Sequence, residues 1–319
     1  MTTQLTPGRW RGLKTTSTDD HIFTILAFDQ RGSYRKMLPD GTSYDDAAAI
    51  KGEIVSALTT KTSAVLLDNQ YGLMPAMHTR GSCGFLMSYE ESGYSGDATY
   101  RKLIFDPQWT LGKIKKMGAS AVKLLAYYHP HSGALAEEVE GVIRQVVQES
   151  HAHDLPVFLE PMSYSTDASI AKESADFAAL RPQIVIDTAE RLTSTGADVL
   201  KLEFPVDAAF DADRALWQST CERVSAVCTV PWVLLSAGVD FEVFAEQAQI
   251  ASTAGASGWL AGRAIWKEAV TLTPENRTAF LRDVALPRAE KLSAIATQHS
   301  RAWTDFYTPP AASDTWFRD

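Results

Sequence analysis

Apolar and polar positions follow a repeating pattern along the chain, in which short apolar runs alternate with longer amphipathic stretches. Short runs rich in Val, Ile, Leu and Phe are typical of strands, whereas apolar residues at helical spacing predict helices. The eight apolar runs are FTILAFD (23–29), AVLLDN (64–69), CGFLMSY (83–89), AVKLLAYY (121–128), PVFLEPMS (156–163), DVLKLEFP (198–205), WVLLSAG (232–238) and GWLAGRA (258–264). Helices are expected over residues 44–59, 107–116, 134–153, 180–195, 212–228, 241–254 and 276–303. The link between the second and third runs is short and is expected to be non-helical.

Eight β/α units in a row, with no linker between them, predict an α/β protein built as one (β/α)8 TIM barrel. A doubly wound sheet is the alternative, but its GxGxxG phosphate turn is missing after the first run, where the chain reads FDQRGSYR. We expect a single domain over residues 1–319. It would comprise an N-terminal arm or short helix (1–20), the barrel (22–267) and a C-terminal helix with an irregular tail (268–319).

Composition narrows the classes of partner. The 319 residues carry a net charge of −9 and are 45% hydrophobic, which argues against a nucleic-acid or anionic-membrane partner. No apolar run approaches the ~20 residues that span a bilayer, and the first residues lack the apolar core of a signal peptide. Three cysteines suit a reducing compartment, so a cytoplasmic location is expected.

One lysine lies at the centre of the sixth run, DVLKLEFP. Apolar residues on both faces mark a strand that is covered on both sides, as in parallel sheets. Burial disfavours the charged ammonium of Lys201 and leaves a neutral amine that can act as a nucleophile. The alternatives are a buried Lys–Glu ion pair or a lysine that reaches water at the end of the strand.

Polar residues at the C-terminal ends of barrel strands are where catalysis takes place in this fold. Lys123, Glu160 and Lys201 come from three consecutive runs, so their side chains should converge. A second cation would further favour the neutral amine of Lys201, and a carboxylate between them is placed for proton transfer. This set suits Schiff-base chemistry on a ketone. A structural charge network is the alternative reading, although burying several ions is unfavourable unless they are closely compensated.

The last two runs predict a phosphate site. Loops after the seventh and eighth strands often bind phosphate in these barrels. Ser236, Gly238 and Gly262 would expose backbone N–H groups, and Arg263 would add a guanidinium suited to bidentate contact. The alternative is that the glycines serve tight turns and Arg263 forms a structural ion pair.

A metal-dependent mechanism is not expected. Among the seven histidines, only His129 and His131 follow a strand closely, and a third ligand is missing. Cys221 and Cys228 lie seven residues apart on a predicted helix and are expected to pack as small apolar residues. We therefore predict no metal and no cofactor.

Taken together and in order, the motifs resemble a known family. These are FTILAFDQRG, LLDNQYGL, CGFLMSYEESGY, AVKLLAYY, FLEPMSY, ADVLKLEFPV, PWVLLSAGVD and GWLAGRAIW. They are similar to those of the LacD-type class I aldolases, the tagatose 1,6-bisphosphate aldolases, over roughly residues 22–267. PWVLLSAGVD and GWLAGRAIW are also similar to the sulfofructose 1-phosphate aldolases. The chain lacks a longer insertion that LacD-type proteins carry after the Schiff-base strand.

The resemblance implies a role for each matching residue. Lys201 would form the Schiff base, Glu160 would be the acid/base, and Lys123 would lie beside it. Substrate contacts would fall on the residues Asp29, Gln30, Arg31, Ser236, Gly238, Gly262 and Arg263. Arg31 and residues near Gln70 are candidates for the distal anion. The implied reaction cleaves a ketohexose 1-phosphate to dihydroxyacetone phosphate and a three-carbon aldehyde.

Several alternatives remain open at this point. The anion on C6 can be a phosphate or a sulfonate, and strictness at C4 is undetermined. A catalytically silent sugar-phosphate sensor on the same barrel is the non-enzyme alternative, and a transaldolase-like or deoxyribose-phosphate-like reaction is a weaker enzymatic one. A homo-oligomer is expected. The tail aromatics Trp303, Phe306, Tyr307, Trp316 and Phe317 could serve its interface or cover the barrel's own helices.

Overall fold

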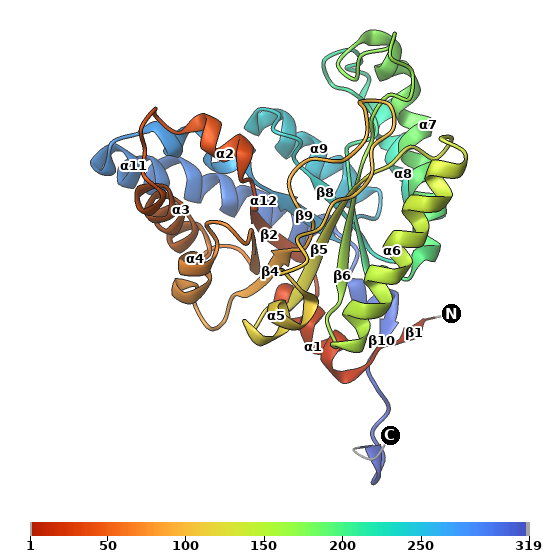
Figure 1. Ribbon diagram of the computed structural model, residues 1–319, viewed down its shortest axis with the longest axis horizontal. Helices are drawn as coiled ribbons and strands as arrows, with labels where there is room; N and C mark the ends of the chain where they lie inside the picture. Colours follow the sequence, from red (N-terminus) through yellow and green to blue (C-terminus); the bar gives the residue numbers. More distant parts are fainter. Residues whose placement is uncertain (1, 317–319) are drawn as a thin grey trace.

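A closed barrel of eight parallel strands forms the centre of the molecule (Figure 1). The computed structural model describes residues 2–316. The strands pair in sequence order, and the last pairs with the first. Their bounds are β2 Phe23–Phe28, β3 Ala64–Leu67, β4 Gly84–Ser88, β5 Ala121–Tyr127, β6 Val157–Met162, β7 Val199–Leu202, β8 Trp232–Leu235 and β9 Gly258–Ala261. Each predicted apolar run contains one strand, which confirms the (β/α)8 barrel.

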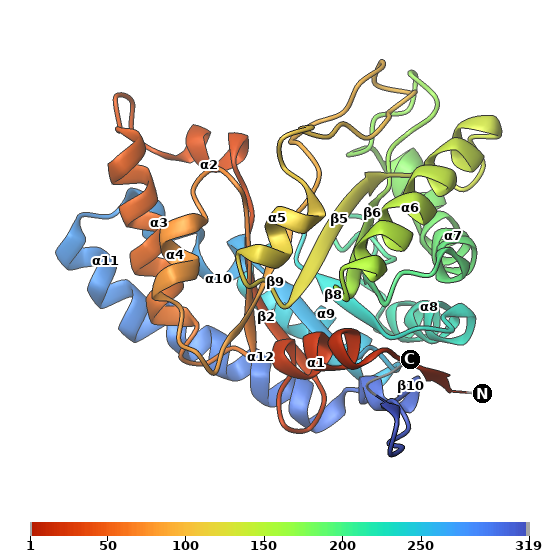
Figure 2. The same cartoon turned by 60° about the horizontal axis from the view of Figure 1, so that its bottom comes forward.

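Helices connect the strands and surround the barrel (Figures 1 and 2). Their bounds are α2 Gly32–Met37, α3 Tyr44–Leu58, α4 Leu73–His78, α5 Leu111–Lys116, α6 Ala134–Ala152, α7 Ala175–Leu192, α8 Arg214–Val227, α9 Phe241–Thr253 and α10 Arg263–Trp266. Short 3-10 turns follow at Thr193–Thr195, Lys267–Thr271 and Trp303–Asp305. Side-chain caps determine where several of the helices begin, because a serine, threonine or aspartate oxygen accepts a free backbone N–H of the first turn. The capping residues are Ser43, Thr110, Ser174 and Asp213.

Two of the predicted helix assignments are wrong. The link after β3 contains α4, because Pro75 lies in the first turn, where its missing N–H removes no helical hydrogen bond. The helix predicted from Pro107 begins at Leu111 instead. Asp106 accepts the N–H of Gln108 in a turn, and the helix starts only at the Thr110 cap. The helix α2, directly after β2, was not predicted.

The N-terminal segment closes the lower face of the barrel. Helix α1 (Pro7–Thr16) lies across the N-terminal ends of the strands, as Figure 2 shows. A Cβ at Gly12 would lie 2.4 Å from the carbonyl oxygen of Ser120, so only glycine permits this close approach. The predicted arm is therefore a packed helix. It is preceded by β1 (Thr3–Gln4), which pairs in parallel with β10 (Tyr307–Thr308).

The C-terminal segment covers the outside of the barrel. The predicted helix is a continuous run of α11 (Pro274–Phe280), a π-helical turn (Leu281–Ala285) and α12 (Leu286–His299). Among the described residues, the aromatic side chains of the tail differ in how far they are buried. Trp303 is fully buried and Tyr307 is 5% exposed, so these two rings cover the chain's own core, whereas Trp316 is 59% exposed. Phe317 lies outside the described residues. No described helix combines the length and the apolar character that a membrane span requires.

An ionic cluster centred on Asp198 lies under α1, at the N-terminal ends of the strands. Asp198, which immediately precedes β7, is 1% exposed and accepts from Arg9 Nε at 3.0 Å. Its second oxygen lies 2.8 Å from His151 Nε2 and accepts the backbone N–H of Val157 at 2.8 Å. The cluster therefore joins α1, α6, β6 and β7 at the end of the barrel where the strands begin.

The substitution Asp198→Ala should lower the free energy of unfolding by about 3 kcal/mol, because it leaves the buried N–H of Val157 and the partly buried guanidinium of Arg9 without their acceptor. Urea denaturation measures this change. The control is Glu290→Ala, which removes an exposed pair with Lys61 and should lower stability by less than about 1 kcal/mol. Equal losses of stability in the two variants would contradict the assignment.

Candidate active site

A cavity of about 1210 Å³ opens at the C-terminal ends of the strands. The loops after β4 and β6 rise highest around this rim (Figure 2). The side chains of Asp29, Lys123, Glu160 and Lys201, from four different strands or strand ends, all line the cavity. This is the face on which (β/α)8 barrels carry their chemistry.

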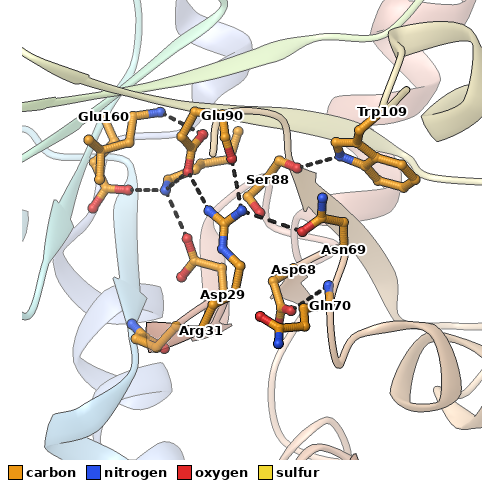
Figure 3. Close-up of polar contacts among 12 residues, drawn as sticks. Asp29, Arg31, Asp68, Asn69, Gln70, Ser88, Glu90, Trp109 and Glu160 are labelled. Atoms are coloured by element: carbon orange, nitrogen blue, oxygen red, sulfur yellow. Dashed lines mark hydrogen bonds and ion pairs between the residues drawn. The ribbon is translucent and has the colours of Figure 1, made fainter. Parts of the chain in front are cut away.

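Lys123 lies at the centre of a cluster of three carboxylates. Its Nζ lies 2.8 Å from Asp29 Oδ2, 2.9 Å from Glu90 Oε1 and 2.9 Å from Glu160 Oε2. Figure 3 shows the carboxylates of Asp29 and Glu160 pointing towards one shared position. The Lys123 side chain is 2% exposed, so these carboxylates provide the charge compensation that water would otherwise supply.

Lys201 shares the carboxylate of Glu160 with Lys123. Lys201 Nζ lies 3.0 Å from Glu160 Oε1, and the Lys201 side chain is 4% exposed. The structure therefore brings Lys123, Glu160 and Lys201 together, with one oxygen of Glu160 in contact with each lysine. Among the described residues, Glu160 is the one carboxylate in ion-pair contact with Lys201, whereas Lys123 has three.

The two cationic neighbours also act on Asp29. Burial alone would raise the pKa of Asp29, but Lys123 and Lys201 hold it well below its usual range. Burial alone would likewise lower the pKa of the Lys123 ammonium, yet the carboxylates of Asp29, Glu160 and Glu90 raise it well above its usual value. Lys123 is therefore a permanent cation at neutral pH, and Asp29 is a permanent anion.

Glu203, which shares a strand face with Lys201 in the sequence pattern, does not pair with it. Glu203 accepts from the backbone N–H of Ser163 at 2.8 Å and from Lys172 Nζ at 3.0 Å. Arg181 also lies within ion-pair distance, at 3.7 Å. This network links the loop after β6 to the end of β7. Because Glu203 is paired there, Glu160 is the carboxylate that contacts Lys201.

Glu90 belongs to the site but was not predicted from the sequence. Its Oε2 accepts the backbone N–H of Leu125 at 2.9 Å, while its Oε1 contacts Lys123. Arg31 Nη2 also donates to that Oε1 at 3.4 Å (Figure 3). The sequence does place Glu90 immediately after the third apolar run, at the C-terminal end of a predicted strand, and this position could have marked it as a candidate.

The predicted substrate contacts after β2 and β3 take different positions. Gln30 and Arg31 line the cavity, whereas Gln70 does not. Gln70 is exposed, and its Nε2 donates to the hydroxyl of Tyr71 at 3.2 Å. Instead of Gln70, Asn69 accepts from Arg31 Nη1 at 3.4 Å. Gln70 therefore lies outside the cavity lining, and a contact of this segment with the distal anion stays a prediction.

The predicted phosphate turn also lines the cavity. Ser236 Oγ accepts the backbone N–H of Gly262 at 3.4 Å, which joins the loops after β8 and β9. Gly238 has φ +83°, and a Cβ there would lie 3.0 Å from Arg263 Cζ, so the guanidinium lies directly over this glycine. Ser236, Gly238, Gly262 and Arg263 thus line the cavity together, and Arg263 adds a cation to this wall.

Within residues 2–316, no group of three or more His, Cys, Asp and Glu side chains is arranged to hold a metal ion. The cysteines Cys83, Cys221 and Cys228 are free and buried.

Known proteins resemble this chain over most of its length. Residues 23–268 match the DeoC/LacD family aldolase profile. A tagatose 1,6-diphosphate aldolase of Streptococcus agalactiae is 30% identical over 324 positions, covering 94% of this chain and 99% of the relative. One from Listeria monocytogenes is 34% identical over 302 positions, covering 88% of each chain.

Solved structures share the fold at low sequence identity. An archaeal fructose 1,6-bisphosphate aldolase superposes with a TM-score of 0.62 at 18% identity, covering 91% of this chain and 99% of that one. A second archaeal fructose-1,6-bisphosphate aldolase, with its catalytic Lys bound to a carbinolamine intermediate, has a TM-score of 0.63 at 19% identity and the same coverage.

Proposed function

The chain belongs to the DeoC/LacD family of aldolases, and we propose that it is a class I aldolase acting on tagatose 1,6-bisphosphate or a closely related ketohexose 1-phosphate. The products would be dihydroxyacetone phosphate and a three-carbon aldehyde. The observation that carries this proposal is the Glu160 carboxylate, which lies between the two buried lysines Lys123 and Lys201.

The charge distribution supports Lys201 as the nucleophile. Lys123 is surrounded by three carboxylates, which keep it protonated, and a protonated amine cannot attack a carbonyl. Lys201 is paired with one carboxylate, Glu160, which can receive its proton. Lys123 would then act as a fixed cation that orients Glu160 and balances its charge.

The reaction follows from these positions. The neutral amine of Lys201 adds to C2 of the open-chain ketose, and Glu160 protonates the departing hydroxyl of the carbinolamine, so that water leaves and an iminium forms. Glu160 then accepts the proton of the C4 hydroxyl. The C3–C4 bond breaks, the aldehyde departs, and the bonding electron pair moves into the iminium to give an enamine. Protonation at C3 and hydrolysis release dihydroxyacetone phosphate and regenerate the lysine.

The phosphate on C1 would lie against the wall formed by Ser236, Gly238, Gly262 and Arg263. Phosphate binds well to backbone N–H groups presented by small residues and to a guanidinium. Because β8 and β9 follow β7 in the barrel, a 1-phosphate held there lies beside the carbon that Lys201 would attack.

Glu160→Gln tests the proton-transfer role. The amide keeps the size of the side chain but cannot transfer the proton, so kcat should fall about 10²- to 10⁴-fold. A coupled assay for dihydroxyacetone phosphate measures this change. The matched control is Glu140→Gln, a buried carboxylate on α6 outside the cavity, which should change kcat less than about twofold. An unchanged kcat in the Glu160 variant would remove this residue from the mechanism.

The other expectations follow from the same proposal. The Schiff-base route uses no metal and no cofactor. A silent sugar-phosphate sensor would need neither the lysine nor its carboxylate, and both are in place. The cytoplasmic location and the homo-oligomer stay predictions.

A further inference from the structure

Charge pairing divides the cationic side chains of the cavity into two groups. Seven lysines and arginines line it, and five of them form ion pairs with carboxylates: Arg31, Lys123, Lys172, Arg181 and Lys201. Among the described residues, no carboxylate lies within ion-pair distance of the other two, Lys36 and Arg263. An anionic substrate is attracted most strongly by cations that are not already neutralised.

A ketose 1,6-bisphosphate carries two separate anions, and the cavity has two cations without a carboxylate partner. Arg263 lies over Gly238 in the turn assigned above to the 1-phosphate. We propose that Lys36, with Ser33 beside it, holds the distal anion of the substrate. This inference rests on the aldolase activity proposed above and adds a residue that determines its substrate specificity.

The position of Lys36 on α2 fits this role. Gly32, Ser33 and Lys36 line the cavity, at a spacing that places them on one face of the helix. Tyr34, on another face, is fully buried, and its hydroxyl donates to the carbonyl of Ala47 at 2.7 Å. This anchor fixes the rotation of α2 about its axis, so that Lys36 faces the cavity.

The segment from β2 to α2 leads from the reacting centre to the rim. At its inner end Asp29 contacts Lys123. The next two residues each have a buried polar atom without a hydrogen-bond partner among the described residues, Gln30 Oε1 and Arg31 Nε. Both residues also line the cavity, between Asp29 and α2. Lys36 is the exposed end of this series, which suits an anion at the far end of the sugar.

Arg31 alone does not supply the charge for a distal anion. Its guanidinium donates to the carbonyl and carboxylate of Glu90, so the pair has no net charge. Lys36 is the cation on the β2–α2 segment that has no carboxylate within ion-pair distance among the described residues.

Steady-state kinetics of Lys36→Met tests the proposal, with tagatose 1,6-bisphosphate and tagatose 1-phosphate as the two substrates. The variant should raise KM for the bisphosphate about tenfold at low ionic strength, with kcat changed less than about twofold. Kinetics with the 1-phosphate, which has no distal anion, should not change. Lys36→Arg should restore most of the bisphosphate affinity. The matched control is Arg35→Met on the same helix, because Arg35 is exposed but does not line the cavity.

Borohydride trapping with dihydroxyacetone phosphate separates failure of this inference from failure of the proposed function. The wild type and Lys36→Met should give equal adducts, because this ligand lacks the distal anion. Weaker trapping in Lys36→Met would place Lys36 at the 1-phosphate and overturn the proposal. Equal KM values for the bisphosphate in the variant and the wild type would also overturn it. If the wild type itself formed no adduct with dihydroxyacetone phosphate, this result would instead contradict the proposed aldolase activity.

Discussion

Replacing Lys201 with methionine should lower kcat by about 10⁴-fold or more, because methionine has no amine that could form the covalent intermediate with the substrate. Lys123 cannot substitute, since Asp29, Glu90 and Glu160 keep it protonated. Methionine preserves the volume of the lysine stem in a site where the side chain is 4% exposed. The same coupled assay for dihydroxyacetone phosphate measures the loss.

The Lys201→Met protein should remain folded. Glu160 keeps its contact with Lys123 at 2.9 Å, so removal of Lys201 leaves no carboxylate without a cation. Circular dichroism and the thermal unfolding midpoint provide the check. A folded variant that retains wild-type turnover would exclude a Schiff base at this lysine.

Lys123→Met should produce the largest loss of stability among single substitutions in the site. It leaves three carboxylates buried around an apolar side chain, and removal of one partner from a buried ionic group lowers stability by about 3–5 kcal/mol. Urea denaturation at pH 7 measures the difference. Activity should fall as well, because Glu160 loses the cation that orients it.

The stability deficit of Lys123→Met should depend on pH. In the wild type, the lowered pKa of Asp29 gives stability that is present above its unfolded value of about 3.9 and is lost as the pH falls below it. In the variant, buried carboxylates without their cation bind protons more readily, which relieves the penalty in acid. The deficit should therefore be smaller at pH 5 than at pH 8. A deficit that is constant over this range would indicate lost packing alone.

The barrel could be predicted because each of its strands and most of its helices can be recognised from the pattern of apolar residues within a short stretch of sequence. Each strand is a short apolar run, and helical spacing separates the runs. The convergence of Lys123, Glu160 and Lys201 followed from the same reasoning, because consecutive barrel strands are neighbours and all three residues lie on β5, β6 and β7. Their individual charge states did not follow, because these depend on how many carboxylates reach each lysine.

The missed residues lie on segments that have no strand periodicity. Glu90 is two residues beyond the end of β4, in a loop whose direction is set by contacts with β5 and Arg31. Lys36, which we propose as the contact to the distal anion, lies on a helix of six residues that is too short to show an amphipathic pattern. The position of Gln70 also depends on such a contact, because Asp68 accepts its backbone N–H at 2.8 Å and turns the chain there (Figure 3).

The central claim is that Lys201 forms a Schiff base with the substrate. Intact-protein mass spectrometry after borohydride reduction in the presence of dihydroxyacetone phosphate tests it most directly, followed by peptide mapping. The account predicts one adduct on Lys201 in the wild type and none in Lys201→Met. An adduct on Lys123, or no adduct under conditions that trap a known Schiff-base aldolase, would contradict it.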